Sequence, residues 1–255
     1  MSEKKEKTKI LNDLQKYISS GKYKSALKIV NENKYPELYS TVFPKHNNNT
    51  LLIMACGKND RDMNAVAIAL ILTGHSNPGH ANNYGKTALM LAGIYYADDV
   101  AKAIIATEDF NPSQRDYSGC TALNYVCKGE KWTDVALALI RTGQSIPENV
   151  GDYGQTALHN ACWYKMAQVA IELIRTGRAM PYHVDNNGNT ALMDACMNSG
   201  AMGACRDSNM EEVAIELIRT GQSNPQQINR YNSTALIYAC KKNKRSEEHT
   251  SELQS

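Results

Sequence analysis

The feature that most constrains the fold of this 255-residue chain is an internal repeat. A Thr followed by Ala-Leu or Leu-Leu recurs at successive spacings of 37, 34, 35, 34 and 44 residues. The six positions are Thr50, Thr87, Thr121, Thr156, Thr190 and Thr234. Self-similarity at a period near 34 residues predicts a row of similar units, each packed on its neighbours.

Each unit has the pattern of two short helices. In TALHNACW, small and apolar residues recur three to four positions apart, and Thr156 stands where a helix N-cap is expected. In VAIELIRTG an apolar stripe is followed by Gly177, which can end a helix in the left-handed conformation. The stripe consists of Val169, Ala170, Leu173 and Ile174, which we expect to be buried between helices.

A further column of residues lies two positions before each repeated Thr. It holds Gly85, Gly119, Gly154 and Gly188, with Asn48 and Asn232 in the outer units. Gly and Asn share a tolerance of positive φ. We therefore interpret this column as the turn of a finger that projects from the helices.

The pattern G-x-T-A-L-x-x-A followed by V-A-x-x-L-I-x-x-G resembles the ankyrin repeat, whose inner-helix signature is T-P-L-H-x-A. Thr156, Leu158, His159 and Ala161 match that signature, and Ala157 replaces its Pro. The resemblance implies an all-α ankyrin-repeat solenoid with short turn or β-hairpin fingers. The wording R-T-G-Q-S-N-P and T-A-L-I-Y-A-C also resembles ankyrin arrays of giant DNA viruses, which implies a protein of the host cytoplasm.

The same comparison predicts the domain organisation. We expect residues 1–8 to be a solvated tail and residues 9–46 a degenerate N-terminal capping repeat of two helices. We expect residues 47–242 to form the ankyrin array and its last repeat to be truncated. Its insertion at about 197–209 is predicted to be a flexible loop, with a dedicated binding loop as the alternative.

The stretch RSEEHTSELQS, Arg245 to Ser255, continues neither the repeat nor any recognisable cap. Back-translated with ordinary codons, it resembles a widely used sequencing adapter. We interpret residues 245–255 as a non-native tail, and a natural acidic tail is the alternative. Under the first interpretation, further repeats, a cap or another module could be missing.

Composition excludes several classes of protein. The net charge of +2 is too small to favour a nucleic-acid or membrane-surface partner, and the longest apolar run, residues 65–72, is too short to span a bilayer. The N-terminus also lacks the apolar core of a signal peptide. We expect a soluble cytoplasmic monomer.

Seven cysteines raise the question of metal or thiol chemistry. Five stand six residues after the repeated Thr, where a small buried residue is needed: Cys56, Cys127, Cys162, Cys196 and Cys240. We expect these to be buried, unbonded core thiols, and neither Cys120 nor Cys205 has a C-x-x-C partner. A His159–Cys162 dyad is the sharpest catalytic candidate, but both residues occupy structural columns of the repeat. We expect no catalytic residues, metal or cofactor.

The aromatic composition points to binding, since there are 14 Tyr and 2 Trp but only 2 Phe. The resemblance implies partner contacts at the finger residues before each Thr and at the end of each inner helix. The partner-binding residues so predicted are Asn83, Tyr84, Lys86, Tyr95, Tyr117, Tyr153, Gln155, Trp163, Tyr164, Asn187, Met197 and Tyr231. We expect Tyr153, Trp163 and Tyr164 to share one exposed concave patch. The alternative is that the Tyr rings only support neighbouring fingers.

The predicted function is therefore a non-catalytic scaffold that binds an unidentified protein on its concave surface, with a host protein as one candidate. A narrower alternative is the substrate-recognition part of a viral ubiquitin-ligase adaptor, whose C-terminal module would be missing. A thiol enzyme or metal protein is the alternative from another class.

Overall fold

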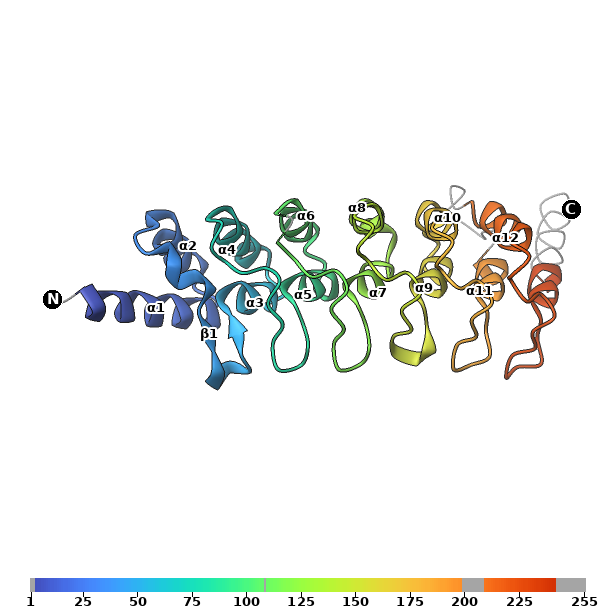
Figure 1. Ribbon diagram of the computed structural model, residues 1–255, viewed down its shortest axis with the longest axis horizontal. Helices are drawn as coiled ribbons and strands as arrows, with labels where there is room; N and C mark the ends of the chain where they lie inside the picture. The colour runs from blue at the N-terminus through green and yellow to red at the C-terminus, as the bar shows by residue number, and fades with distance from the viewer. Residues whose placement is uncertain (1–2, 108, 199–208, 242–255) are drawn as a thin grey trace, which may run out of the picture. The chain divides into compact units, whose positions relative to one another are not determined.

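The computed structural model describes residues 3–107, 109–198 and 209–241. They belong to two units, divided between Tyr117 and Ser118, and each unit is a row of paired helices (Figure 1). Most of the insertion at about 197–209, Cys205 and the whole of residues 245–255 lie outside the described residues. The expectations for them stay predictions.

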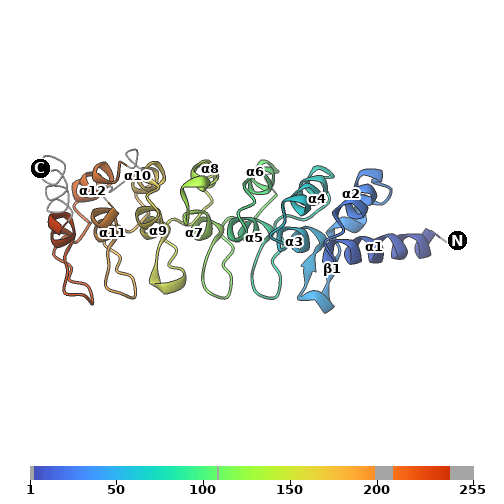
Figure 2. The same ribbon diagram turned by 180° about the vertical axis from the view of Figure 1, so that it is seen from behind.

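In unit 1 the helices form two layers with fingers on the side away from the second layer (Figures 1 and 2). The inner layer contains α1 (Glu3–Ser19), α3 (Leu51–Cys56) and α5 (Ala88–Ile94), and the outer layer contains α2 (Tyr23–Glu32), α4 (Arg61–Leu72) and α6 (Asp98–Ala106). Within each layer neighbouring helices pack on one another. The 3-10 helices η1 (Pro36–Ser40) and η2 (Pro44–His46) lie between α2 and α3.

The first finger of unit 1 is a short hairpin. Its strands β1 (Val42–Phe43) and β2 (Asn49–Thr50) are antiparallel, with Val42 opposite Thr50 and Phe43 opposite Asn49. In the second finger an antiparallel bridge pairs Ala81 with Thr87.

Unit 2 repeats the two-layer plan. Its inner layer contains α7 (Ala122–Val126), α9 (Ala157–Trp163) and α11 (Ala191–Asn198), and its outer layer contains α8 (Thr133–Arg141), α10 (Ala167–Arg175) and α12 (Met210–Arg219). The 3-10 helices η3 (Glu130–Trp132) and η4 (Asp152–Gly154) complete it, and residues 235–241 are also helical.

The repeated Thr begins each inner helix, as the sequence predicts. The Thr156 hydroxyl accepts a hydrogen bond from the backbone N–H of His159 at 3.4 Å, and the other repeated Thr residues accept the equivalent bond. These bonds satisfy one of the N–H groups that a helix leaves unpaired at its start. At Thr121 and Thr156 a capping box adds a second bond, in which the Thr N–H donates to the side chain of Asn124 or His159.

The core of each unit lies between its layers. Val169, Ala170 and Leu173 are fully buried, as predicted, but Ile174 is only half-buried because it lies at the edge of the stripe. The repeated Val is fully buried throughout, at Val66, Val100, Val135, Val169 and Val213.

The cysteine column follows the prediction in four of five units. Cys56, Cys127, Cys162 and Cys196 are buried, whereas Cys240 is exposed, so the prediction is wrong there. Cys240 lies in the last helical segment that the structure describes, where no later described helix covers the column. Burial raises the pKa of Cys56 to about 12 and that of Cys196 to about 11.

The N-terminus corrects another expectation, because residues 3–8 are not a tail. Helix α1 begins at Glu3, where the sequence predicted solvated chain as far as residue 8. Lys7 pairs with Glu3 at 2.8 Å and with Glu37 at 3.0 Å, and Glu6 pairs with Lys34. The residues that looked like a solvated charge run therefore join α1 to the segment that follows α2.

Candidate functional site

The turn column of the fingers has the backbone conformation that its residues predict. The φ angle is +71° at Gly85, +71° at Gly154 and +82° at Gly188, and Asn48 and Asn232 are also positive. At Gly85 a Cβ would lie 2.8 Å from the carbonyl oxygen of Arg115 and from the Cα of Asp116. Gly is therefore required there both by φ and by close packing of the next finger.

Backbone hydrogen bonds join the finger tips of unit 1. The N–H of Asn83 donates to the carbonyl of Asn47 at 2.9 Å, and the N–H of Tyr117 donates to the carbonyl of Tyr84 at 3.0 Å. The rings of Tyr84 and Tyr117 also meet edge to face, with centroids 6.5 Å apart. This ring contact supports the alternative role of Tyr residues between fingers, yet both side chains remain exposed.

The fingers of unit 2 are joined by the same type of bond. The N–H of Asn186 donates to the carbonyl of Tyr153, and that of Arg230 to the carbonyl of Asn187, both at 3.0 Å. The main chain at each tip is thereby fixed, while the side chains of Tyr153 and Tyr231 stay 66% and 71% exposed.

A groove of about 460 Å³ lies in unit 1 between the fingers and the inner helices. Its lining includes Tyr84, Lys86 and Tyr95, three of the predicted partner-binding residues. The apolar part comes from α3 and α5, with Ile53, Met54, Leu91 and Ile94. Ile53 and Met54 are buried, so they form the floor of the groove.

The charged side chains around this groove are basic. Lys45, Lys58 and Lys86 line it together with His46, and none of the described residues in its lining carries a carboxylate. Lys86 Nζ lies 3.7 Å from the buried Asp116 Oδ2, and Lys58 Nζ donates to the carbonyl of Ser19. The groove therefore combines an apolar floor with a positively charged wall.

The sequence prediction missed three basic residues of the groove, Lys45, His46 and Lys58. For Lys58 the repeat register contained a signal. Lys58 stands eight residues after Thr50, the register that Tyr95 holds after Thr87. Lys45 and His46 belong to the first finger, which the sequence assigned largely to the capping repeat.

In unit 2 the end of an inner helix carries exposed aromatic side chains. Trp163 is the last residue of α9 and Tyr164 is its C-cap, and their side chains are 47% and 40% exposed. The expected exposure of Tyr153, Trp163 and Tyr164 is confirmed, whereas their role in binding stays a prediction.

The remaining predicted residues differ in exposure. Asn83 and Tyr117 are exposed, whereas Tyr95, Gln155, Asn187 and Met197 are half-buried. Gln155 accepts the N–H of Gly151 through its carbonyl, and Asn187 is held by the bond from its N–H to Asp185 Oδ1 at 2.8 Å. These two positions serve first to shape their fingers.

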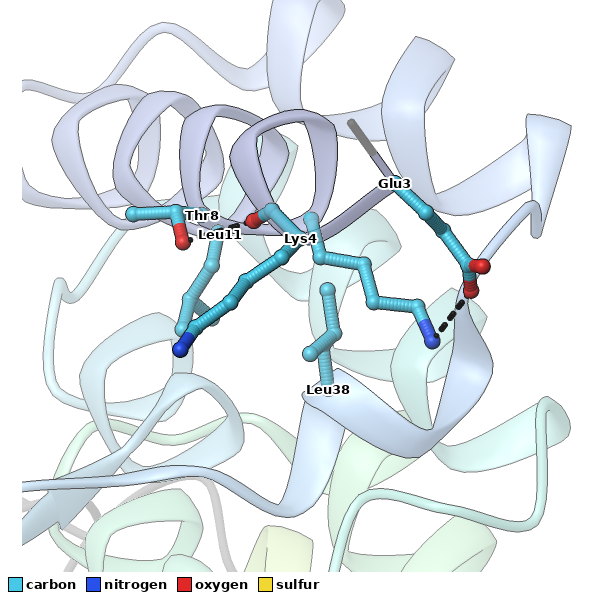
Figure 3. A pocket seen from close by; sticks show the side chains of 6 residues that line it. Glu3, Lys4, Thr8, Leu11 and Leu38 are labelled. Atoms are coloured by element: carbon cyan, nitrogen blue, oxygen red, sulfur yellow. Dashed lines mark hydrogen bonds and ion pairs between the residues drawn. The ribbon is translucent and has the colours of Figure 1, made fainter. Parts of the chain in front are cut away.

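A second hollow, of about 390 Å³, lies between α1 and η1 (Figure 3). Leu11 and Leu38 provide its apolar lining, and the Glu3–Lys7 ion pair lies at its edge. Thr8 Oγ1 donates to the carbonyl of Lys4 within the same helix. None of the predicted partner-binding residues lines this hollow.

His159 and Cys162 have the surroundings of core residues. His159 Nδ1 lies 2.8 Å from Thr156 Oγ1, and Nε2 lies 3.2 Å from the carbonyl oxygen of Asn189. Burial lowers the pKa of His159 to about 4 and raises that of Cys162 well above its ordinary value. A neutral imidazole engaged through both nitrogens and a protonated thiol are poorly matched to nucleophilic catalysis.

Two searches of the described parts of the chain gave no candidates. No helix there has the length and apolar composition to cross a membrane. Nor do residues 3–107, 109–198 and 209–241 contain a group of three or more His, Cys, Asp or Glu side chains placed to hold a metal ion.

No family model and no curated protein sequence matches this chain. Among solved structures, the chain is similar to the human ASB11 ankyrin repeat domain (TM-score 0.59, 18% identity, covering 89% of this chain and 90% of that one). It is also similar to the ankyrin repeat domain of Bcl-3 (TM-score 0.56, 19% identity, covering 89% of this chain and 93% of that one). A third similar chain comes from the structure of the Bdellovibrio bacteriovorus endopeptidase Bd0816 in complex with the immunity protein Bd3460 (TM-score 0.55, 21% identity, covering 76% of this chain and 92% of that one). The two-layer helix pairs, the fingers and these similarities show that the fold is an all-α ankyrin-repeat solenoid.

Proposed function

We propose that this chain is a non-catalytic scaffold that binds a partner protein through its finger tips and the ends of its inner helices. The observation that carries the proposal is the exposure of aromatic side chains at these positions. Tyr117 at one tip is 81% exposed, and Trp163 at the end of α9 is nearly half exposed.

Physical chemistry favours protein recognition by such side chains. Tyr and Trp bury a large area when a partner covers them, and they lose few rotatable bonds in doing so. The finger backbones that present Tyr84 and Tyr153 are already joined to neighbouring fingers by hydrogen bonds. Little ordering of the main chain is then needed on binding, which lowers its entropic cost.

The partner and its setting are further parts of the proposal. We infer a host protein met in the cytoplasm by a monomeric protein of a giant virus, because the repeat wording resembles such arrays. One of the similar structures is itself a complex of two proteins, which fits a binding role. The ligase-adaptor role is a narrower form of the proposal, and it predicts ubiquitin-ligase subunits in the captured material. Residues 245–255 remain proposed as non-native.

Affinity capture from a host-cell lysate tests the binding role. The bait is compared with a Trp163→Ala/Tyr164→Ala variant, in which two exposed side chains at the end of α9 are truncated. A matched control, Ile215→Ala/Ile218→Ala, truncates two exposed side chains on the outer helix α12.

We expect the control to retain the proteins that the unaltered chain captures and the aromatic variant to lose at least one of them. Trp163 and Tyr164 are accessible, so their truncation leaves the core intact. If only the outer-helix variant loses the captured proteins, the binding surface lies on the outer layer and the proposal is overturned.

A further inference from the structure

The groove of unit 1 has a chemical character that narrows its occupant. We propose that it binds an extended acidic peptide segment of the partner protein, with one apolar side chain seated on its floor. This inference rests on the proposed binding function and goes beyond it by naming the chemistry of the bound segment.

Charge complementarity is the first argument. Lys45 and Lys58 are exposed, and Lys86 and His46 line the same groove. None of the described lining residues is acidic, but the buried Asp116 pairs with Lys86 at 3.7 Å and offsets its charge, so the positive charge of the groove comes mainly from Lys45 and Lys58. A segment with two or three carboxylates would be attracted into this groove, whereas a basic segment would be repelled.

The floor supplies the second argument. Ile53 and Met54 from α3 and Leu91 and Ile94 from α5 face the space between the fingers and the inner helices. Because Ile53 and Met54 are already buried, an aliphatic or aromatic side chain of the bound segment would cover the half-buried Leu91 and Ile94, and Tyr84 and Tyr95 lie in the same lining. This apolar floor also favours a peptide over a single-stranded nucleic acid, which uses several cations and stacked rings along a phosphate backbone.

The volume of the groove supplies the third argument. About 460 Å³ accommodates a few residues of extended chain and is too small for a folded domain. Its wall contains Asn47, whose amide group can exchange hydrogen bonds with a peptide backbone, whereas the amide of Asn82 donates to Asn49 Oδ1 at 2.9 Å and accepts from the N–H groups of Tyr84 and Lys86. A short extended segment therefore fits the size, the charge and the polar groups of the lining.

Selection from a phage-displayed library of random 12-residue peptides tests the proposal on the full chain. Peptides that bind the unaltered protein are sequenced, and their affinities are measured by fluorescence anisotropy in low and high NaCl. The same peptides are tested on Lys45→Glu/Lys58→Glu and on the control Lys24→Glu/Lys28→Glu, whose lysines are exposed on the outer helix α2. The Trp163→Ala/Tyr164→Ala variant is included to report on unit 2.

We expect acidic peptides with one apolar residue, about tenfold weaker binding to the groove variant, unchanged binding to the control, and weaker binding in high salt. Selected peptides without acidic enrichment, or equal loss in both charge variants, would overturn the proposal. Peptides lost only in the Trp163/Tyr164 variant would refute the acidic groove and leave the binding function standing. Peptides unaffected by every variant would contradict both. A 12-nucleotide single-stranded RNA that binds the groove more tightly than any peptide would assign it to nucleic acid instead.

Discussion

Unit 1 and unit 2 build their fingers in the same way, with exposed Tyr side chains at the tips of both, but they differ in the side chains around their inner helices. In both, a residue with positive φ forms the turn, and backbone bonds join neighbouring tips. In unit 1 lysines surround an apolar groove. In unit 2 the end of α9 carries the exposed Trp163 and Tyr164, and buried polar side chains such as His159 and Asp194 lie in its inner helices.

This difference separates what the fold requires from what recognition can vary. The N-cap Thr, the turn residue and the apolar stripe recur because each unit needs the same backbone and the same core. Positions that project from this frame, such as Lys58 and Tyr164, occupy the same register with unlike chemistry. We propose that these variable positions determine which partner binds.

The largest expected effect comes from the turn of a finger. Gly85→Ala combines positive φ with a Cβ that would meet the next finger at 2.8 Å, whereas Gly74→Ala has almost the same φ and nothing within 4 Å. We expect Gly74→Ala to cost about 1–2 kcal/mol and Gly85→Ala about 3–4 kcal/mol. Urea unfolding followed by circular dichroism measures both.

Unit 2 offers the matched pair. Gly188→Ala would place a Cβ 2.9 Å from the Cα of Asn229, whereas at Gly177 nothing lies within 4 Å. We expect Gly188→Ala to lower the free energy of unfolding more than Gly177→Ala does. Tryptophan fluorescence can follow this unfolding because Trp132 and Trp163 both lie in unit 2. Equal losses within either pair would show that finger packing contributes nothing beyond the strain of positive φ.

The next effect concerns Asp194, a carboxyl group buried in α11. Neither of its oxygens has a hydrogen-bond partner among the described residues, and burial, with a smaller effect of Asp185, raises its pKa well above the ordinary 3.8. Because the folded state holds the proton more tightly, the stabilising contribution of the protonated Asp194 is fully present below pH 3.8 and is lost as the pH rises toward the folded pKa. We expect Asp194→Asn to stabilise unit 2 at pH 7 by about 1–3 kcal/mol.

Urea unfolding of unit 2, monitored by tryptophan fluorescence between pH 4 and pH 8, checks this prediction. The gap between the variant and the unaltered protein should widen as the pH rises. Asp152→Asn, which removes an exposed carboxylate from a finger, is the control for loss of charge. A variant less stable than the original at pH 7 would mean that the Asp194 carboxylate has a stabilising partner.

A smaller effect distinguishes two helix caps. Thr87→Ala in unit 1 removes one bond to the N–H of Met90, and we expect it to cost about 1 kcal/mol. Thr156→Ala in unit 2 also leaves His159 Nδ1 without its contact at 2.8 Å, so the cost should rise to about 2 kcal/mol. Thermal melting of both variants, with Thr→Ser at each site as the control, measures the difference. Equal costs would mean that the contact between the Thr156 hydroxyl and His159 Nδ1 adds nothing.

The smallest effect is expected at the N-terminus. Hydrogen bonds from Lys34 and then Tyr35 lower the pKa of Glu6, so its contribution to stability is present above pH 4.5 and is lost as the pH falls through the folded pKa. Glu6→Gln should lower the Tm slightly at pH 7, and about 0.5 M NaCl should shrink the difference. Melting curves at both salt concentrations test this, with Lys9→Gln as the control. A salt-independent loss would point to packing rather than charge.

Much of the fold could be predicted because it repeats. The Thr column, the Gly and Asn turn column and the buried Val column each follow from one local rule applied in several units. The errors fall where a unit is atypical. Cys240 lies in the last described helix, and residues 3–8 are held by Glu37 and Lys34, which lie about thirty residues away in the sequence.

The candidate site was only partly predictable for a related reason. The exposure of Tyr153 and Trp163 follows from their repeat register. The groove in unit 1 depends on how the first finger, the end of α1 and two inner helices come together, and no period encodes that. Lys45 and His46 therefore became visible as groove residues only in the structure.

Site-directed photo-crosslinking can show whether the partner contacts the finger tips or the outer helices, and it therefore tests the proposed binding surface. A benzoyl-phenylalanine is introduced singly at Tyr84, Tyr153 or Tyr231 on the finger tips, and at Leu72, Ile215 or Ile218 on the outer helices, all of which are exposed. With the captured partner present, we expect crosslinks from the finger positions and none from the outer-helix positions. Crosslinks confined to the outer helices would contradict it.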